Sequence, residues 1–411
     1  MSASLLEVCA WDAEDPLREV AARFVRPEGL IYLDGNSLGA APVDAYGRLE
    51  AAVAGEWAQG LVRSWNGADW IGAPARIGAK IAHLIGARPS EVVVADSTSV
   101  NLFKLLVAAL QRQAPRGVIL SEPGEFPTDL YVAQGVAATL PGVSLRLLPA
   151  EELVAAIGAD VGVVMLTHVH YRTGARRDMA AITQRAREAG ALVIWDLSHS
   201  AGAVQVDLAG ARAELAVGCG YKYLNGGPGA PAYLYVAERR QAELSSPLTG
   251  WMGHDDPFEF GDVYRPAAGM DRFLVGTPPM LSMLALECGV DQFEGVDMAA
   301  VEAKARRLCS LFIERVEDRC GGHGLQLITP CAPARRGGHV SFTHPDAYAI
   351  MQALIERGVI GDFRGPDVLR CGFAPLYTRF EDVWRAVEVL AEVLNTDAWR
   401  DPRYQTRARV T

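Results

Sequence analysis

The stretch VGVVMLTHVHYRTGARRDMAAITQRAREAGALVIWD, residues 161–196, decides the fold class. It holds two apolar runs, at 161–170 and 191–196, separated by a segment of helical character at 178–190. Strands that are apolar throughout are expected where helices cover both faces of a parallel sheet. The stretch therefore predicts a strand–helix–strand unit within such a sheet.

Similar apolar runs on either side extend this unit, and we predict further strands at 91–96, 117–122, 144–149 and 230–236. Residues 245–280 are rich in Gly, Pro and Asp, and long helices near 279–294 and 298–320 follow them. The sequence thus predicts an α/β protein: a large domain on a mostly parallel sheet, then a smaller α+β domain. The end of the chain, residues 399–411, is expected to be a frayed tail.

The composition excludes several classes of protein. The chain has 411 residues, a formal net charge of −10 and 50% hydrophobic residues. No apolar run approaches the roughly 20 residues of a membrane helix, and the start lacks a signal-peptide pattern. An acidic chain is a poor partner for nucleic acid, and seven cysteines without a C-x-x-C pair predict reduced thiols. We expect a cytoplasmic protein that binds neither membranes nor nucleic acid.

Lysine is scarce, since only Lys80, Lys104, Lys222 and Lys304 occur among 39 basic residues. Helical periodicity predicts that three of them lie on solvated helix faces. Lys222 instead lies between two tyrosines on a glycine-rich loop. A desolvated lysine has a lowered pKa and becomes nucleophilic enough to form a Schiff base. The alternative is a strand-end lysine that reaches out to water.

Asp196 ends a strand that is predicted to be buried, so its charge needs a cationic partner or several donors. A pyridinium nitrogen is such a partner in enzymes that use pyridoxal phosphate (PLP), whereas an N-cap or a structural ion pair is the alternative. Thr98 and Ser99 follow another strand at a helix start, where hydroxyls and free N–H groups suit a phosphate. A plain N-cap would look the same. No dinucleotide or nucleoside-triphosphate loop motif is present.

The segment YLDGNSLG, residues 32–39, closely resembles the N-terminal signature of the kynureninases. Six more segments resemble motifs of that family in the expected order: EFPTD (125–129), THVHYRTG (167–174), DLSHSAG (196–202), GYKYLNGGPG (220–229), GTPP (276–279) and RCGFAPLY (370–377). The resemblance spans nearly the whole chain. It implies the fold type I architecture of PLP-dependent transferases, with a seven-stranded-type sheet in the large domain.

The resemblance also implies a domain division and roles for particular residues. Residues 1–40 would contribute to the small domain, 41–285 would form the large PLP-binding domain and 286–411 the small domain. Lys222 matches the lysine that binds PLP covalently, and Arg370 matches the arginine that binds the substrate α-carboxylate. The other implied cofactor-binding residues are Thr98, Ser99, Phe126, Pro127, Thr128, Asp129, Thr167, Asp196, His199, Tyr221, Trp251 and Thr277.

Within this set, Phe126 would stack on the pyridine face, and Trp251 and Thr277 would arrive from a second subunit of a homodimer with a shared active site. The implied reaction is hydrolysis of L-kynurenine or 3-hydroxykynurenine, an amino-acid substrate, to alanine and anthranilate or its hydroxylated form. Lys222 and Tyr221 are the candidates for proton transfer, and Asp196 keeps the pyridine nitrogen protonated.

Some residues leave alternatives open. His170 stands where the family has an amide and Thr277 where asparagine is common, which affects substrate fit more than reaction class. His168 and His170 lie on one strand face but lack a third ligand, so we predict no metal site. A cysteine desulfurase would need a thiolate on a mobile loop, for which Cys331 is the candidate. A binding protein without activity would be expected to lack the lysine or its aspartate, and both are present.

Overall fold

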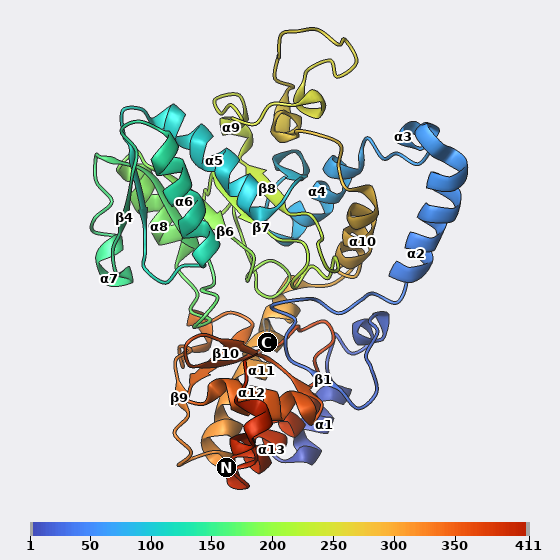
Figure 1. Ribbon diagram of the computed structural model, residues 1–411, viewed down its shortest axis with the longest axis vertical. Coiled ribbons are helices and arrows are strands. Elements are labelled where there is room, and N and C mark those ends of the chain that lie inside the picture. The colour runs from blue at the N-terminus through green and yellow to red at the C-terminus, as the bar shows by residue number, and fades with distance from the viewer. Residues whose placement is uncertain (1–2, 408–411) are drawn as a thin grey trace.

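The computed structural model describes residues 3–407, which fold into two lobes (Figure 1). The upper lobe holds a seven-stranded sheet of order β2-β8-β7-β6-β5-β3-β4, in which β8 alone is antiparallel to its neighbours. The fold prediction is confirmed. The strands are β2 (Val92–Val94), β3 (Val118–Ser121), β4 (Ser144–Leu147), β5 (Val161–Thr167), β6 (Leu192–Asp196), β7 (Leu215–Gly218) and β8 (Tyr233–Val236).

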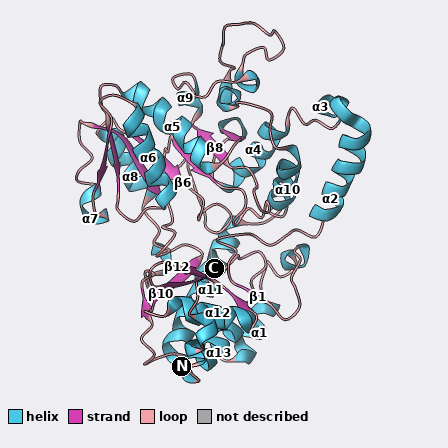
Figure 2. Ribbon diagram, viewed as in Figure 1, coloured by secondary structure: helices cyan, strands magenta, loops and turns pink. Residues whose placement is uncertain are grey.

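Both faces of this sheet are buried, as the apolar runs predict. Along β5, Val163 and Met165 belong to one apolar cluster, whereas Val164 and Leu166 belong to another on the opposite face. Helices pack on the sheet from both sides (Figure 2). Those that lie against its strands are α4 (Ala73–Leu84), α5 (Thr98–Gln113), α6 (Pro127–Thr139) and α8 (Met179–Glu188), and the same lobe also holds α7 (Ala150–Leu153), α9 (Glu238–Gln241) and α10 (Met280–Asp291).

The lower lobe has a four-stranded antiparallel sheet of order β12-β13-β10-β9 and its own apolar core. Its elements are α11 (Met298–Arg319), β9 (Gln326–Leu327), β10 (His339–Thr343), α12 (Ala347–Glu356), β11 (Val359–Ile360), β12 (Asp362–Arg364), β13 (Val368–Gly372) and α13 (Phe380–Asn395). The N-terminal segment joins this lobe through α1 (Leu5–Ala13) and through β1 (Ile31–Tyr32), which pairs with β11. The Asp12 carboxylate accepts the N–H groups of Phe380 and Glu381 at the start of α13. The division at residues 40 and 285 stays a prediction.

An arm projects from the upper lobe at the right of Figure 1. It comprises α2 (Ala45–Ala51), the π-helix η2 (Ala52–Gly60), the 3-10 turn η3 (Leu61–Arg63) and α3 (Ser64–Gly67). Large apolar side chains are exposed along it, namely Tyr46, Val53, Trp57, Leu61 and Val62. The remaining short 3-10 helices are η1 (Val20–Arg23), η4 (Pro89–Glu91), η5 (Trp251–Gly253), η6 (Gly269–Phe273), η7 (Pro333–Arg335), η8 (Ala398–Arg400) and η9 (Pro402–Tyr404).

Two of the lysine predictions are wrong. Lys104 is fully buried, where Nζ pairs with Asp96 and donates to the carbonyl of Phe273 at 2.7 Å. Lys304 is also buried and pairs with Asp15 at 2.6 Å. Helical periodicity could not reveal these environments, because most of the partners come from distant parts of the chain. Only Lys80 is half-exposed as part of a surface ion-pair cluster.

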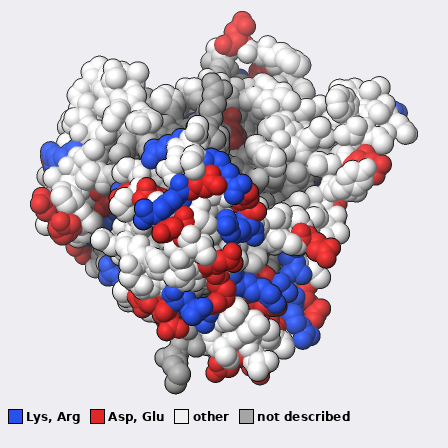
Figure 3. Space-filling view, turned by 60° about the horizontal axis from the view of Figure 1, so that its bottom comes forward, with Lys and Arg blue, Asp and Glu red and all other residues white. Residues whose placement is uncertain are grey.

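The frayed tail is also wrong for residues 399–407, since Trp399 and Tyr404 are buried against the lower lobe; residues 408–411 lie outside the described part. Among residues 3–407, the structure has no helix with the length and apolar character that crossing a membrane requires. On the face in Figure 3, acidic and basic side chains are interspersed rather than gathered into one basic patch.

Candidate active site

Several of the predicted site residues lie at strand ends along one edge of the large sheet. Thr167 is the last residue of β5, and Asp196, the last of β6, is its direct neighbour in register. Asp196 also pairs with Val217 of β7, after which the chain turns into the loop that carries Lys222. The carboxyl ends of parallel strands therefore bring these side chains together, as open α/β sheets do.

Lys222 is buried, with 8% of its surface exposed. Its Nζ lies 3.4 Å from His199 Nδ1 and 5.5 Å from the centre of the Phe126 ring. The signature segment packs against its loop, because Gly39 N donates to Tyr221 O at 2.8 Å. A side chain on Gly39 would collide with the Lys222 carbonyl, so only glycine fits there. The alternative of a lysine that reaches out to water is wrong.

Three acidic side chains are buried beside Lys222, namely Glu125, Asp129 and Asp196. Burial, the charge of Asp196 and a hydrogen bond to it raise the pKa of Asp129 far above its usual value. Burial also raises the pKa of Glu125 to about 8, although the Thr167 hydroxyl and amide donate to its carboxylate at 2.5 and 3.1 Å. The Asp196 carboxylate accepts from Ser198 N at 2.7 Å. Carboxylates so close to one another retain protons and attract a cationic donor.

This donor set fits PLP. No described Lys, Arg or His forms an ion pair with Asp129 or Asp196, so a pyridinium N–H would supply the cation that this pair lacks. The Phe126 ring, held edge-on against Tyr171 at 5.3 Å, provides an aromatic face beside the Lys222 amine.

The helix start that was predicted to bind the phosphate is the N-terminus of α5. Ser97 is its N-cap, and Ser97 Oγ accepts from Val100 N at 3.3 Å. The capping role therefore belongs to Ser97 and not to Thr98 or Ser99. The half-buried hydroxyls of these two residues stand in the first turn, at the positive end of the helix dipole.

Arg370 lies on β13 and is 1% exposed, so the alternative of a surface ion pair is wrong. Its Nε donates to Asp362 Oδ1 at 2.8 Å, and Nη2 donates to Ser37 Oγ at 3.0 Å. Nη1 lies 3.4 Å from His199 Nε2. Since His199 Nδ1 lies 3.4 Å from Lys222 Nζ, one imidazole connects the arginine to the lysine. The structure thus joins His199 and Arg370, which come from different lobes.

Other predicted residues lie apart from this group. Trp251 is 37% exposed and packs on Trp65 and Phe258 with ring centres 6.3 and 6.0 Å apart, away from the contacts of Lys222. Thr277 lies on the exposed segment before α10. Cys331 is exposed, and its carbonyl accepts from an arginine of its own loop. Nothing in these contacts makes Cys331 the thiol of a desulfurase.

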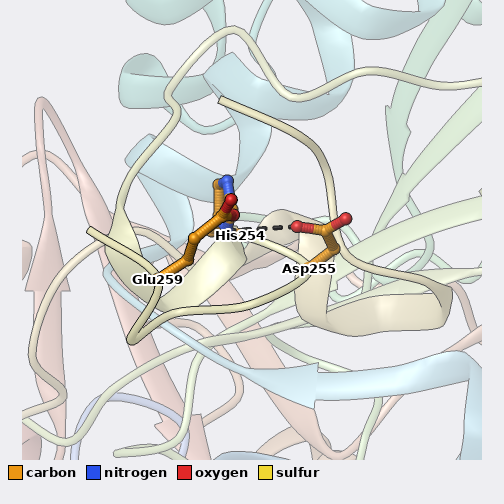
Figure 4. A group of neighbouring side chains, drawn as sticks. All are labelled: His254, Asp255 and Glu259. Atoms are coloured by element: carbon orange, nitrogen blue, oxygen red, sulfur yellow. Dashed lines mark ion pairs between the residues drawn. The ribbon is translucent and has the colours of Figure 1, made fainter. Parts of the chain in front are cut away.

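The histidine pair does not form a metal site. His168 Nε2 accepts from Arg176 at 3.4 Å, whereas His170 Nε2 contacts Gly124 O at 2.7 Å and Nδ1 accepts amides of its own turn. Of the described residues, His254, Asp255 and Glu259 form a group with metal-ligand spacing (Figure 4). Arg265 pairs with both of its carboxylates, which offsets part of the negative charge that would attract a cation.

Several residues at this site have no strong sequence signal of their own. Asn36 and Ser37 are part of the signature segment, and the structure places both against Arg370. Asp362 is eight residues before Arg370, and only the turn between β12 and β13 brings the two together. Glu125 belongs to the EFPTD segment, but nothing in the sequence shows that its carboxyl is buried.

Comparison with known proteins identifies close relatives. The family description "Kynureninase C-terminal domain" matches residues 301–390. The proteins named Kynureninase from Burkholderia mallei (strain SAVP1) and Pseudomonas fluorescens are each 52% identical to this chain; the matches cover 98% of this chain and 99% and 98% of those proteins.

Solved structures show the same fold at lower identity. The apo cysteine desulfurase of Thermococcus onnurineus NA1 has a TM-score of 0.75 at 20% identity, over 92% of this chain and 98% of that one. A C-DES mutant with glycine covalently linked to its PLP cofactor has a TM-score of 0.77 at 20% identity, over 89% and 97%. At such identity the likeness concerns the fold alone.

Proposed function

Since the chain belongs to the kynureninase family, its activity is the PLP-dependent hydrolysis of the Cβ–Cγ bond of kynurenine, and we propose that Lys222, Asp196, Tyr221 and Arg370 carry it out. The products are L-alanine and anthranilate from L-kynurenine, or 3-hydroxyanthranilate from the 3-hydroxy substrate. The chain is thus a hydrolase that acts on a carbon–carbon bond next to a ketone.

The observation that carries these roles is the position of His199 between the two functional groups. Lys222 Nζ and Arg370 Nη1 each lie 3.4 Å from one nitrogen of its ring. An α-amino acid has its amine and carboxylate on one carbon, so its binding site needs an amine-handling and a carboxylate-binding group close together. The arginine fork supplies bidentate recognition of the carboxylate.

PLP, when bound, supplies the electron sink that accepts the electron pair left by removal of the α-proton. Asp196 would hold the pyridine nitrogen in its protonated form, with Asp129 sharing a proton beside it, and Phe126 would fix the plane of the ring. The phosphate would bind at Thr98 and Ser99, with Tyr221. The remaining cofactor-binding residues of the proposal are Pro127, Thr128, Thr167, His199, Trp251 and Thr277.

Proton transfer is assigned to two adjacent residues. Lys222 Nζ would take the α-proton, since burial between aromatic rings limits its hydration. The neighbouring Cys219 and burial raise the pKa of Tyr221 above its ordinary value. Tyr221 therefore keeps its hydroxyl proton near neutral pH and is available as a proton donor to the reacting carbon chain.

The same proposal includes a homodimer with a shared active site. The arm 45–67 exposes large apolar side chains in one region, and such surfaces on soluble proteins mark interaction sites. Trp65 at the end of the arm packs on Trp251, one of the two residues that are expected to act in the partner's site. Sedimentation should give twice the chain mass of 44.2 kDa, and a monomer would contradict the proposal.

Anthranilate fluorescence tests the function directly. The PLP-loaded protein should release anthranilate from L-kynurenine, and a parallel assay with 3-hydroxykynurenine ranks the two substrates. Lys222→Ala is the matched control, because it should abolish release and also the borohydride-fixable yellow colour. Sulfide release from cysteine without anthranilate release would favour a desulfurase, whereas a protein that stays colourless with PLP would favour a binding module.

A further inference from the structure

The guanidinium of Arg370 is saturated with protein acceptors. Its Nε donates to Asp362 Oδ1 at 2.8 Å, and Nη2 donates to Asp362 Oδ2 and, at 3.0 Å, to Ser37 Oγ. Its Nη1 donates to Tyr171 O at 2.6 Å and faces His199 Nε2 at 3.4 Å. A guanidinium has five N–H donors, and these five contacts engage all of them; the Asn36 amide oxygen is a further acceptor, 3.0 Å from Nε and 3.1 Å from Nη2. A carboxylate can therefore bind Arg370 only by replacing one or more of these partners.

Asp362 is the partner that is hardest to replace. It lies directly opposite Arg370 in the β12–β13 pairing, and both side chains are almost fully buried. Burial alone would raise the pKa of Asp362, but Arg370 and Arg364 hold it well below its ordinary value, so the group stays charged. Removing a charged, buried partner on both of its oxygens costs more than giving up a neutral one.

His199 and Ser37 are the partners that a substrate can replace. The His199 contact is the longest of the five. Burial, together with the nearby Lys222 charge, lowers the pKa of His199 well below its ordinary value, so the imidazole is neutral. The Ser37 hydroxyl is neutral too. His199 contacts Nη1, which also donates to the Tyr171 carbonyl, and Ser37 contacts Nη2, so both neutral side chains lie against the two terminal nitrogens of the guanidinium.

We propose that Asp362 is the positioning residue of the substrate-carboxylate site. It holds the Nε–Nη2 edge of Arg370 and thereby presents the Nη1–Nη2 end to the α-carboxylate, which replaces His199 and Ser37 there. Arg364 also pairs with Asp362 at 2.6 Å. Two guanidiniums thus share one carboxylate, and a single positive charge is left for the substrate. This inference rests on the proposed function, in which Arg370 binds the substrate carboxylate.

Asp362→Asn in the PLP-loaded enzyme tests the proposal, because it keeps the size of the side chain but removes its charge. We expect the KM for L-kynurenine to rise about tenfold or more while kcat changes less than about threefold, as for loss of a charge-assisted pair that acts on binding. The visible absorbance of the cofactor should not change. Kynuramine, which is kynurenine without its α-carboxylate, should inhibit the variant and the parent chain equally.

Asp15→Asn is the matched control, since it breaks a buried Asp–Lys pair outside the site, with side chains only 5% and 4% exposed. It should lower stability without changing KM. If Asp362→Asn does not fold, Asp362→Glu keeps the charge and shifts the carboxylate, and its KM should rise about threefold. An unchanged KM in the folded variant, equal weakening of kynuramine, or the same KM change in Asp15→Asn would overturn the proposal.

A fourth variant separates this inference from the function on which it rests. Arg370→Gln should raise the KM for L-kynurenine at least as much as Asp362→Asn does. An unchanged KM in Arg370→Gln would refute the carboxylate role of Arg370 itself. A raised KM in Arg370→Gln together with an unchanged KM in Asp362→Asn would refute only the positioning role.

Discussion

Because Lys104 is buried, its replacement should lower the stability of the protein far more than replacement of a lysine on a solvated helix face, which is where helical periodicity places it. An exposed helix lysine can be replaced at a cost within about 0.5 kcal/mol. In the structure, Lys104→Ala removes three buried methylenes, worth about 0.8 kcal/mol each. It also leaves the Phe273 carbonyl without its donor, which costs about 1–3 kcal/mol. The free energy of unfolding should therefore fall by about 3–5 kcal/mol.

Urea unfolding of the PLP-loaded protein, followed by tryptophan fluorescence, measures this change from the shift in midpoint. Lys104→Met keeps most of the apolar stem, so its loss should be smaller than that of Lys104→Ala by about 1–2 kcal/mol. Lys80→Ala is the control, because its ion pairs are half-exposed and should be worth less than about 1 kcal/mol. Equal midpoints for Lys104→Ala and Lys80→Ala would refute the reasoning.

Three further predictions concern the site. Burial and the charge of Asp362 raise the pKa of Asp34 to about 7, so Asp34 loses its proton above that pH and offsets the positive charge that a carboxylate needs. The KM for L-kynurenine should rise between pH 6 and 8.5, and Asp34→Asn should flatten this profile. Tyr221→Phe should lower kcat by about 100-fold or more with the cofactor absorbance retained; near-normal kcat would exclude Tyr221 as the proton donor. Gly39→Ala should displace the Lys222 loop and weaken PLP binding, and equilibrium dialysis that gave an unchanged affinity would contradict this.

The architecture could be predicted where a local pattern is sufficient. The run 161–167 is apolar on both faces because it lies in the centre of the sheet, and β5 covers these residues. β7 was not predicted, since LAVG is too short to show a period and only its pairing with β6 and β8 makes it a strand. The environments of Lys104 and Lys304 depend largely on partners far away in the chain.

For the site, too, the sequence predicts only what a local pattern is sufficient to show. Asp196 was predicted from its place at the end of a strand and Thr167 from the family resemblance, and the structure has the two side by side at one edge of the sheet. Asp362 could not be found in this way, because its importance comes from a cross-strand pair with Arg370 and from the distant Ser37.

The signature segment has a consequence for the range of substrates. Its Gly39 rests on the loop of Lys222, while Ser37 contacts Arg370 on the other lobe. Two residues of backbone, which span at most about 7 Å, therefore connect the amine-handling part of the site to the carboxylate-binding part. The backbone therefore fixes the distance between these two parts of the site. Changes elsewhere in the site can alter which substrate side chains fit without altering this distance. Inserting or deleting one residue between 37 and 39 should impair the enzyme toward every α-amino acid alike.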